Sequence, residues 1–298
     1  MNVSNVSLQS GQIAVNHIKI HYYRTGGDKP PIVLSHGAGD DGRCWTMTAE
    51  VLSGDYDVTM PDARGHGLSS EGGGNYSPEI RTDDLNAFID ALELDKPILA
   101  GHSMGAESSM RLAVRHPNRV RAVILEDPVL VIPGEIVFGG WFGQSFQNSP
   151  GGYLSFLKTL KKIPPVIGVP LTRLMNPGFP GSAAAPWFES KKRLSEDFRT
   201  TMARVFEDWN SGYEWLDLLR VPVLLILGNR RKGAIVSIDE ARSHAENRPN
   251  IQILHFPKAN HNIRRSDFPG YLNGIKAFLN GLDSREFSDA SFRHRERR

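Results

Sequence analysis

The chain has 298 residues, of which 40% are hydrophobic and 23% are charged, and its formal net charge is only +2. This composition is typical of a globular protein with one large core, and the near-neutral charge argues against a nucleic-acid partner. Cys44 is the only cysteine, which excludes an intramolecular disulfide, and the N-terminus lacks the pattern of a signal peptide. We therefore expect a cytoplasmic protein, without a membrane span because no apolar run approaches about 18 residues.

Short apolar segments alternate with amphipathic ones along much of the chain. Residues 6–15 and 18–23 alternate apolar and polar side chains and predict an antiparallel hairpin at a sheet edge. Segments with the apolar, β-branched character of buried parallel strands follow at 32–35, 56–60, 98–100, 120–125, 223–227 and 251–256. Helices are predicted at 78–93, with Ser77 as N-cap, and at 104–116 and 267–282. This order predicts an α/β fold with a mostly parallel sheet covered by helices on both faces.

The strand at 98–100 leads directly into Gly101-His-Ser-Met-Gly105. The pattern G-x-S-x-G between a strand and a helix describes a nucleophile elbow, a strained turn that holds the serine Oγ clear of the backbone. Gly101 and Gly105 leave room for this turn, and the N-terminus of the following helix favours developing negative charge. We therefore predict that Ser103 is a catalytic nucleophile.

The strand–helix alternation stops between residues 128 and 220. This stretch has no convincing strand, yet it carries more than half of the Phe, Trp and Tyr residues of the chain. We predict a helical lid at 128–220, inserted after the sixth strand into a core made of 1–127 and 221–282, with a disordered tail at 283–298. The aromatic side chains either pack the lid on the core or line an apolar substrate pocket, and the candidates for the pocket are Trp141, Trp187 and Trp209.

With the elbow, the strand order and this insertion in place, residues 7–282 resemble the α/β-hydrolase superfamily, in its serine hydrolase branch with a helical lid. Leu34-Ser-His-Gly-Ala-Gly39 resembles the HG loop of the family, and Asp62-Ala-Arg-Gly-His-Gly-Leu-Ser69 resembles its structural D-x-R-G-x-G-x-S turn. Lys258-Ala-Asn-His-Asn262 stands where the family has its catalytic histidine. The resemblance implies the α/β-hydrolase fold.

The resemblance also implies an oxyanion hole made by the backbone N–H groups of Ala38 and Met104. Three charged residues follow in the HG loop, namely Asp40, Asp41 and Arg43. We interpret these three as loop charges that face solvent, with contact to the substrate as the alternative.

Nucleophilic attack by a serine requires a base, and an acid that orients the base. Of the ten histidines, His261 lies just beyond the last strand, at the sheet edge where ligands bind, and it is the predicted base. The acid stays open, because the turn at 228–237, where most family members have it, contains no carboxylate. Some members have the acid at the end of the preceding strand.

Two acidic residues, Asp127 and Glu126, end that preceding strand. We take Asp127 as the first choice and Glu126 as the second, since adjacent strand residues point to opposite faces. Asp239 is the remaining candidate, although it falls in the first turn of a predicted helix, where acidic residues are favoured by the helix dipole.

These residues predict a cofactor-free serine hydrolase that cleaves a carboxylic ester or lactone with an apolar body through an acyl-enzyme. No His, Cys or Asp cluster has metal-ligand spacing, so no metal is expected. One alternative within catalysis is hydrolysis of a carbon–carbon bond, or a perhydrolase reaction, on the same triad. An alternative from a different class of protein is a ligand receptor or degenerate hydrolase.

Overall fold

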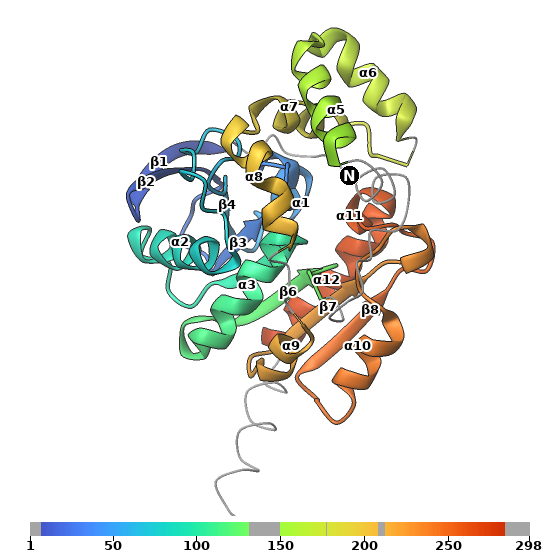
Figure 1. Ribbon diagram of the computed structural model, residues 1–298. Coiled ribbons are helices and arrows are strands. Elements are labelled where there is room, and N and C mark those ends of the chain that lie inside the picture. The colour runs from blue at the N-terminus through green and yellow to red at the C-terminus, as the bar shows by residue number, and fades with distance from the viewer. Residues whose placement is uncertain (1–6, 131–149, 177, 208–211, 284–298) are drawn as a thin grey trace, which may run out of the picture.

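The computed structural model describes residues 7–130, 150–176, 178–207 and 212–283. Figure 1 shows a central sheet between two layers of helices, with a further group of helices at one end. The described strands are β1 (Gln9–Val15), β2 (Ile18–Arg24), β3 (Pro31–Ser35), β4 (Asp57–Pro61), β5 (Ile98–His102), β6 (Ala122–Glu126), β7 (Val223–Leu227) and β8 (Ile251–His255).

These strands form one sheet in the order β1-β2-β4-β3-β5-β6-β7-β8. β1 is antiparallel to β2, and β2 is antiparallel to β4, whereas all other neighbouring pairs are parallel. The predicted edge hairpin and the mostly parallel sheet are thus confirmed. The carboxyl ends of β3, β5, β6, β7 and β8 meet at one edge, which is where open α/β sheets bind ligands.

Alternate residues along the strands pack into two separate cores, one on each face of the sheet. Along β5, Leu99 packs with the layer formed by α2 (Pro78–Ala91), α3 (Met104–Arg115), α9 (Glu214–Leu218) and α10 (Ile238–Ala245). Its neighbour Ile98 packs with the opposite layer, formed by α1 (Thr46–Leu52), α11 (Ile263–Ser266) and α12 (Phe268–Asp283). Both faces of the sheet are covered, as the unbroken apolar strands predicted.

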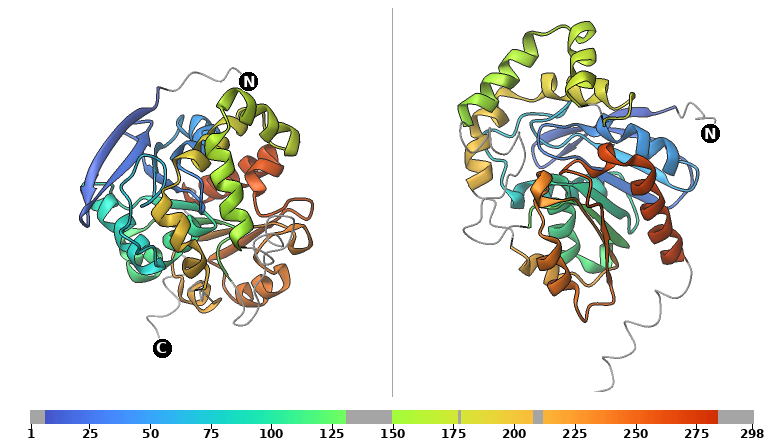
Figure 2. Two further views of the ribbon diagram at one scale, coloured as in Figure 1. Left: turned by 45° about the horizontal axis from the view of Figure 1, so that its top comes forward. Right: turned by 90° about the vertical axis from the view of Figure 1, so that its right-hand side faces the viewer.

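Between β6 and β7, the described residues form helices and connecting turns. These helices are α5 (Pro150–Lys162), α6 (Pro165–Met175), α7 (Ala184–Arg193) and α8 (Glu196–Glu207), and they precede α9. Figure 2 shows α5, α6 and α7 lying across one end of the sheet. Three 3₁₀ turns complete the described secondary structure, at Gly42–Trp45, Pro117–Arg119 and Arg230–Lys232.

Local sequence patterns correctly predicted where two of the helices begin. Ser77 Oγ accepts a hydrogen bond from the Ile80 N–H, so the predicted N-cap is confirmed. Asp239 lies in the first turn of α10, capped by Ser237, as the sequence indicated. The β6 strand begins at Ala122 rather than at residue 120, because a 3₁₀ turn still occupies Pro117–Arg119.

None of the described helices is long and apolar enough to cross a membrane.

Candidate active site

Ser103 lies in a sharp turn between β5 and α3. Its φ of 52° and ψ of −117° are unusual for a residue with a side chain, and such strain is typical of functional turns. A Cβ at Gly101 would lie 2.4 Å from the Ala106 nitrogen, and one at Gly105 would lie 2.3 Å from the Ser35 oxygen. Both flanking positions therefore require glycine, and the turn presents Ser103 at the N-terminus of α3.

The loop after β3 lies directly against this turn. A Cβ at Gly37 would be 2.5 Å from His102 Nδ1, so loop and turn are in van der Waals contact. Gly39 has a φ of +76°, and its N–H donates to His66 Nε2 at 3.0 Å. Ala38 packs in the same apolar cluster as Met104. The two residues expected to supply oxyanion donors therefore pack in one apolar cluster.

His261 lies in the loop after β8, with its side chain 26% exposed. Its Nδ1–H donates to Asp127 Oδ2 at 2.6 Å. His102 Nε2–H donates to the His261 carbonyl oxygen at 3.0 Å, and the two rings lie 4.5 Å apart. This bond ties the His261 loop to the end of β5, next to Ser103. Because Asp127 engages Nδ1, Nε2 is the ring nitrogen left for proton transfer.

Asp127 follows the last residue of β6 and is fully buried. Its φ of +41° turns it out of the strand register. The Ile235 N–H donates to Asp127 Oδ2 at 2.8 Å, and the Val236 N–H donates to Oδ1 at 3.1 Å. Both donors belong to the turn that lacks a carboxylate of its own. That turn instead supplies two donors that fix the carboxylate of Asp127.

The remaining two acid candidates point elsewhere. Glu126 is buried and accepts hydrogen bonds from the Arg264 backbone N–H and from Arg264 Nη1, both at 2.8 Å. Asp239 is exposed on α10. Of the three candidates, Asp127 is therefore the one that contacts His261 in the described structure.

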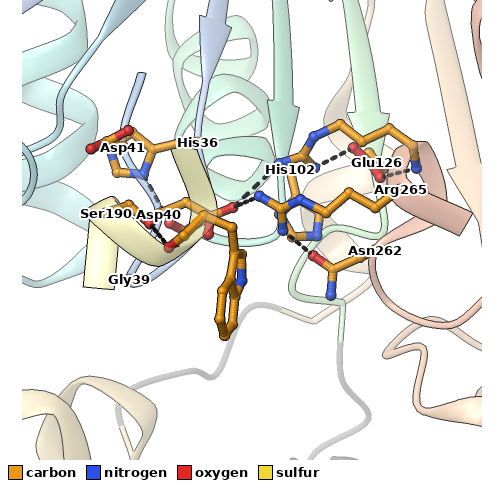
Figure 3. A network of polar contacts seen from close by, with 12 residues as sticks. His36, Gly39, Asp40, Asp41, His102, Glu126, Ser190, Asn262 and Arg265 are labelled. Carbon is orange, nitrogen blue, oxygen red and sulfur yellow. Dashed lines mark hydrogen bonds and ion pairs between the residues drawn. The ribbon is translucent and has the colours of Figure 1, made fainter. Parts of the chain in front are cut away.

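Two of the charged residues in the HG loop are buried, so the expectation that they face solvent is wrong. Asp40 Oδ1 accepts from Lys191 Nζ at 2.7 Å, and its Oδ2 accepts from Arg265 Nη2 at 2.6 Å. Asp41 forms an ion pair with Arg193 at 2.6 Å. Figure 3 shows Asp40, Glu126 and Arg265, which come from separate parts of the chain, in one network of polar contacts. Buried charges of this kind must be paired, which is why the loop recruits cations from two distant segments.

The third of these residues, Arg43, is exposed, as expected. Lys191 has a second role, since its Nζ also donates to the Gly39 carbonyl at 2.7 Å. Lys191 lies on α7, so this bond joins the helices after β6 to the HG loop. Burial alone would raise the pKa of the Asp40 carboxyl, but Arg265, Lys191 and Arg264 hold it well below its usual range.

Two buried histidines near the site are kept neutral. Burial, followed by the neighbouring His36, lowers the pKa of His66 well below its usual value. Burial, followed by Arg264 and His261, lowers the pKa of His102 in the same direction. Neutral His66 is needed for the bond it makes, because its Nδ1–H donates to the Arg64 carbonyl while its Nε2 accepts from Gly39.

Trp187, one of the three candidate pocket residues, is buried on α7. It packs in an apolar cluster in which Met104 and Val129, next to the site, meet side chains of the helices after β6: Leu157, Leu160, Phe188, Leu194 and Phe198. Trp141 and Trp209 lie outside the described residues. The described part of the chain holds no group of three or more His, Cys, Asp or Glu side chains placed to bind a metal ion.

Comparisons with known proteins all find similarity to hydrolases. The model of the "Alpha/beta hydrolase family" matches residues 32–270. N-formylmaleamate deformylase of Pseudomonas putida KT2440 is 26% identical over 280 residues, which cover 90% of this chain and 96% of that protein.

Two solved structures show the same fold. The N-formylmaleamic acid deformylase from Pseudomonas putida S16 has a TM-score of 0.74 at 21% identity, covering 90% of this chain and 100% of that one. The enol-lactonase from Burkholderia xenovorans LB400 has a TM-score of 0.70 at 21% identity, covering 91% of this chain and 100% of that one.

Proposed function

The chain belongs to the alpha/beta hydrolase family and is an enzyme of that fold, and on this premise we propose that it is a serine hydrolase needing no cofactor. Its substrate is a carboxylic ester or lactone with an apolar body, cleaved through an acyl-enzyme. The observation that carries the proposal is the 2.6 Å bond between His261 Nδ1 and Asp127 Oδ2, beside a strained serine at a helix N-terminus. This combination of base, orienting acid and nucleophile is the arrangement that acyl transfer requires.

In the proposed reaction, His261 Nε2 takes the proton of Ser103 as its Oγ attacks the acyl carbon. The backbone N–H groups of Ala38 and Met104 stabilise the oxyanion that forms. His261 then gives the proton to the leaving alcohol oxygen, which leaves Ser103 acylated. A water molecule, deprotonated by the same nitrogen, attacks the acyl-enzyme, and the acid and free serine result. Asp127 stays ionised and stabilises the imidazolium in both steps.

The apolar body of the substrate is proposed from the surroundings of the site. Ala38 and Met104 share one cluster with aromatic and aliphatic side chains of α5, α7 and α8. We propose that residues 128–220 act as a lid over the site, with Trp187 among the pocket residues. A cytoplasmic location, consistent with the single cysteine, completes the proposal.

A second candidate is hydrolysis of an amide-type acyl bond by the same residues. It is favoured by the relative that matches 90% of this chain, whose name describes removal of a formyl group. A carbon–carbon bond hydrolase or perhydrolase would use the same triad, whereas a receptor or degenerate hydrolase would bind a ligand without turning it over.

A substrate panel separates these functions. We expect the protein to hydrolyse esters or lactones of graded acyl length, and Ser103→Ala to lose about 10⁶-fold in rate while remaining folded. Faster turnover of N-formyl amides would favour the second candidate, and cleavage of a β-diketone would favour a carbon–carbon bond hydrolase. A folded protein that turns over no member of the panel would contradict the proposal and favour a receptor.

A further inference from the structure

Helix α6 has its small side chains toward the protein and its large apolar side chains toward the outside. Gly168 and Thr172 are buried, and a Cβ at Gly168 would lie 2.0 Å from the Phe188 ring of α7. The opposite side is apolar and exposed, with Val166 at 79% and Leu174 at 78%. A surface helix normally has the reverse arrangement, with its apolar stripe toward the core.

Exposed apolar side chains are concentrated on this one helix. Of the seven large hydrophobic residues exposed in the described chain, five are on α6: Val166, Ile167, Leu171, Leu174 and Met175. Such a patch on a globular protein indicates an interaction surface. We call the five residues the outer face of α6.

The charged side chains of α5 and α6 are all basic, and Glu196 and Glu71 lie near one of them, Lys161. Lys158, Lys161 and Lys162 at the end of α5 are exposed, and so is Arg173 on α6. The sequence from 150 to 188 contains no Asp or Glu. Figure 1 shows α5 and α6 together at the extremity of the molecule, away from the sheet.

We propose that the outer face of α6, together with the basic end of α5, binds the surface of an anionic lipid bilayer. An apolar helix face flanked by basic residues suits the headgroup region, where apolar side chains reach the acyl boundary and cations meet anionic lipids. The surface contains none of the proposed catalytic residues, so the inference goes beyond the proposed hydrolase function.

A bilayer fits this surface better than a second copy of the chain. The helix has 11 residues, so its face is roughly 16 Å long and 10 Å wide, whereas a stable protein interface buries about 800 Å² on each partner. The positive charge of α5 and α6 would also repel the same two helices of a second copy, while it attracts anionic lipid.

Vesicle co-sedimentation of the full chain tests the proposal. We expect partition onto phosphatidylcholine vesicles that contain phosphatidylglycerol, weaker partition onto pure phosphatidylcholine, and a decrease at high salt. Leu174→Glu should lower the partition coefficient about tenfold or more, and Lys162→Glu about fivefold or more. The matched control is Leu218→Glu on α9, because Leu218 is 52% exposed but lies outside this face, and its binding should equal wild type.

Three results would overturn the proposal: no partition of the wild type onto the anionic vesicles, equal losses in Leu174→Glu and Leu218→Glu, or a wild-type dimer in ultracentrifugation that Leu174→Glu dissociates. Turnover of a short soluble ester is measured in parallel and should be the same in Leu174→Glu as in wild type. Absence of turnover with intact vesicle binding would count against the hydrolase and leave this proposal standing.

Discussion

At the scale of single residues, the two adjacent carboxylates at the end of β6 have different hydrogen-bond partners. Asp127 receives an N–H from His261 and two from the 228–237 turn, whereas Glu126 receives its hydrogen bonds from Arg264. Both are buried, so burial does not distinguish them. The difference lies in which partner each side chain meets after the strand has ended.

We predict that Asp127→Asn lowers kcat by about 10⁴, because an amide neither fixes the required tautomer of His261 nor stabilises its charged form. Glu126→Gln is the matched control. It should keep kcat within tenfold of wild type while lowering the melting temperature, since it breaks a buried ion pair with Arg264. Steady-state kinetics and thermal unfolding of both variants check this, and the opposite ranking of the two kcat values would transfer the role to Glu126.

The sequence predicted Ser103 and His261 from local signals, a strained turn between a strand and a helix and a loop just beyond the last strand. It did not predict the burial of Asp40. Its partners Lys191 and Arg265 are 151 and 225 positions away along the chain, and no periodic pattern links them. One sequence feature could have suggested this buried ion pair. Two consecutive aspartates follow the glycine-rich HG loop, and two consecutive arginines, of opposite charge, follow shortly after His261.

At the scale of elements, α7 and the HG loop are joined by buried charge. Lys191 donates to the Gly39 carbonyl and to Asp40, and the Gly39 N–H in turn donates to His66. The orientation of this loop therefore depends on a lysine from the helices after β6. Those helices were predicted from aromatic content and absent strands, but this contact between side chain and backbone could not be.

We predict that Lys191→Met lowers kcat about 10- to 100-fold with a smaller change in KM, because the HG loop, which we propose supplies an oxyanion donor, loses its support. It should also lower the melting temperature, because buried Asp40 loses one of the cations that pair with it. Lys192→Met is the control, since Lys192 Nζ donates to the Ile163 carbonyl and not to the HG loop. Equal kcat values for the two folded variants would show that Lys191 serves packing alone.

At the scale of the whole molecule, buried neutral histidines couple folding to pH. His66 and His102 have pKa values lowered well below 6.5, first of all by burial. In the unfolded chain they bind protons near pH 6.5, so below that pH the unfolded state holds more protons than the folded state. The free energy of unfolding therefore falls as the pH falls.

We predict that each of these histidines contributes a loss of up to about 1.4 kcal/mol per pH unit between pH 6.5 and 5. Asp40, whose pKa is lowered, adds a further loss as the pH falls below its usual value of 3.8. Urea unfolding across this range measures the slope, and stability that stays constant or rises on acidification would contradict the account.

Covalent labelling is the most direct test of the central claim, that Ser103 is an activated nucleophile. The folded protein is treated with a fluorophosphonate, and the adduct is located by intact mass and peptide mapping. We expect one adduct, on Ser103, that is absent from Ser103→Ala and much slower to form in Asp127→Asn. No adduct on the wild type, or an adduct that persists in Ser103→Ala, would contradict it.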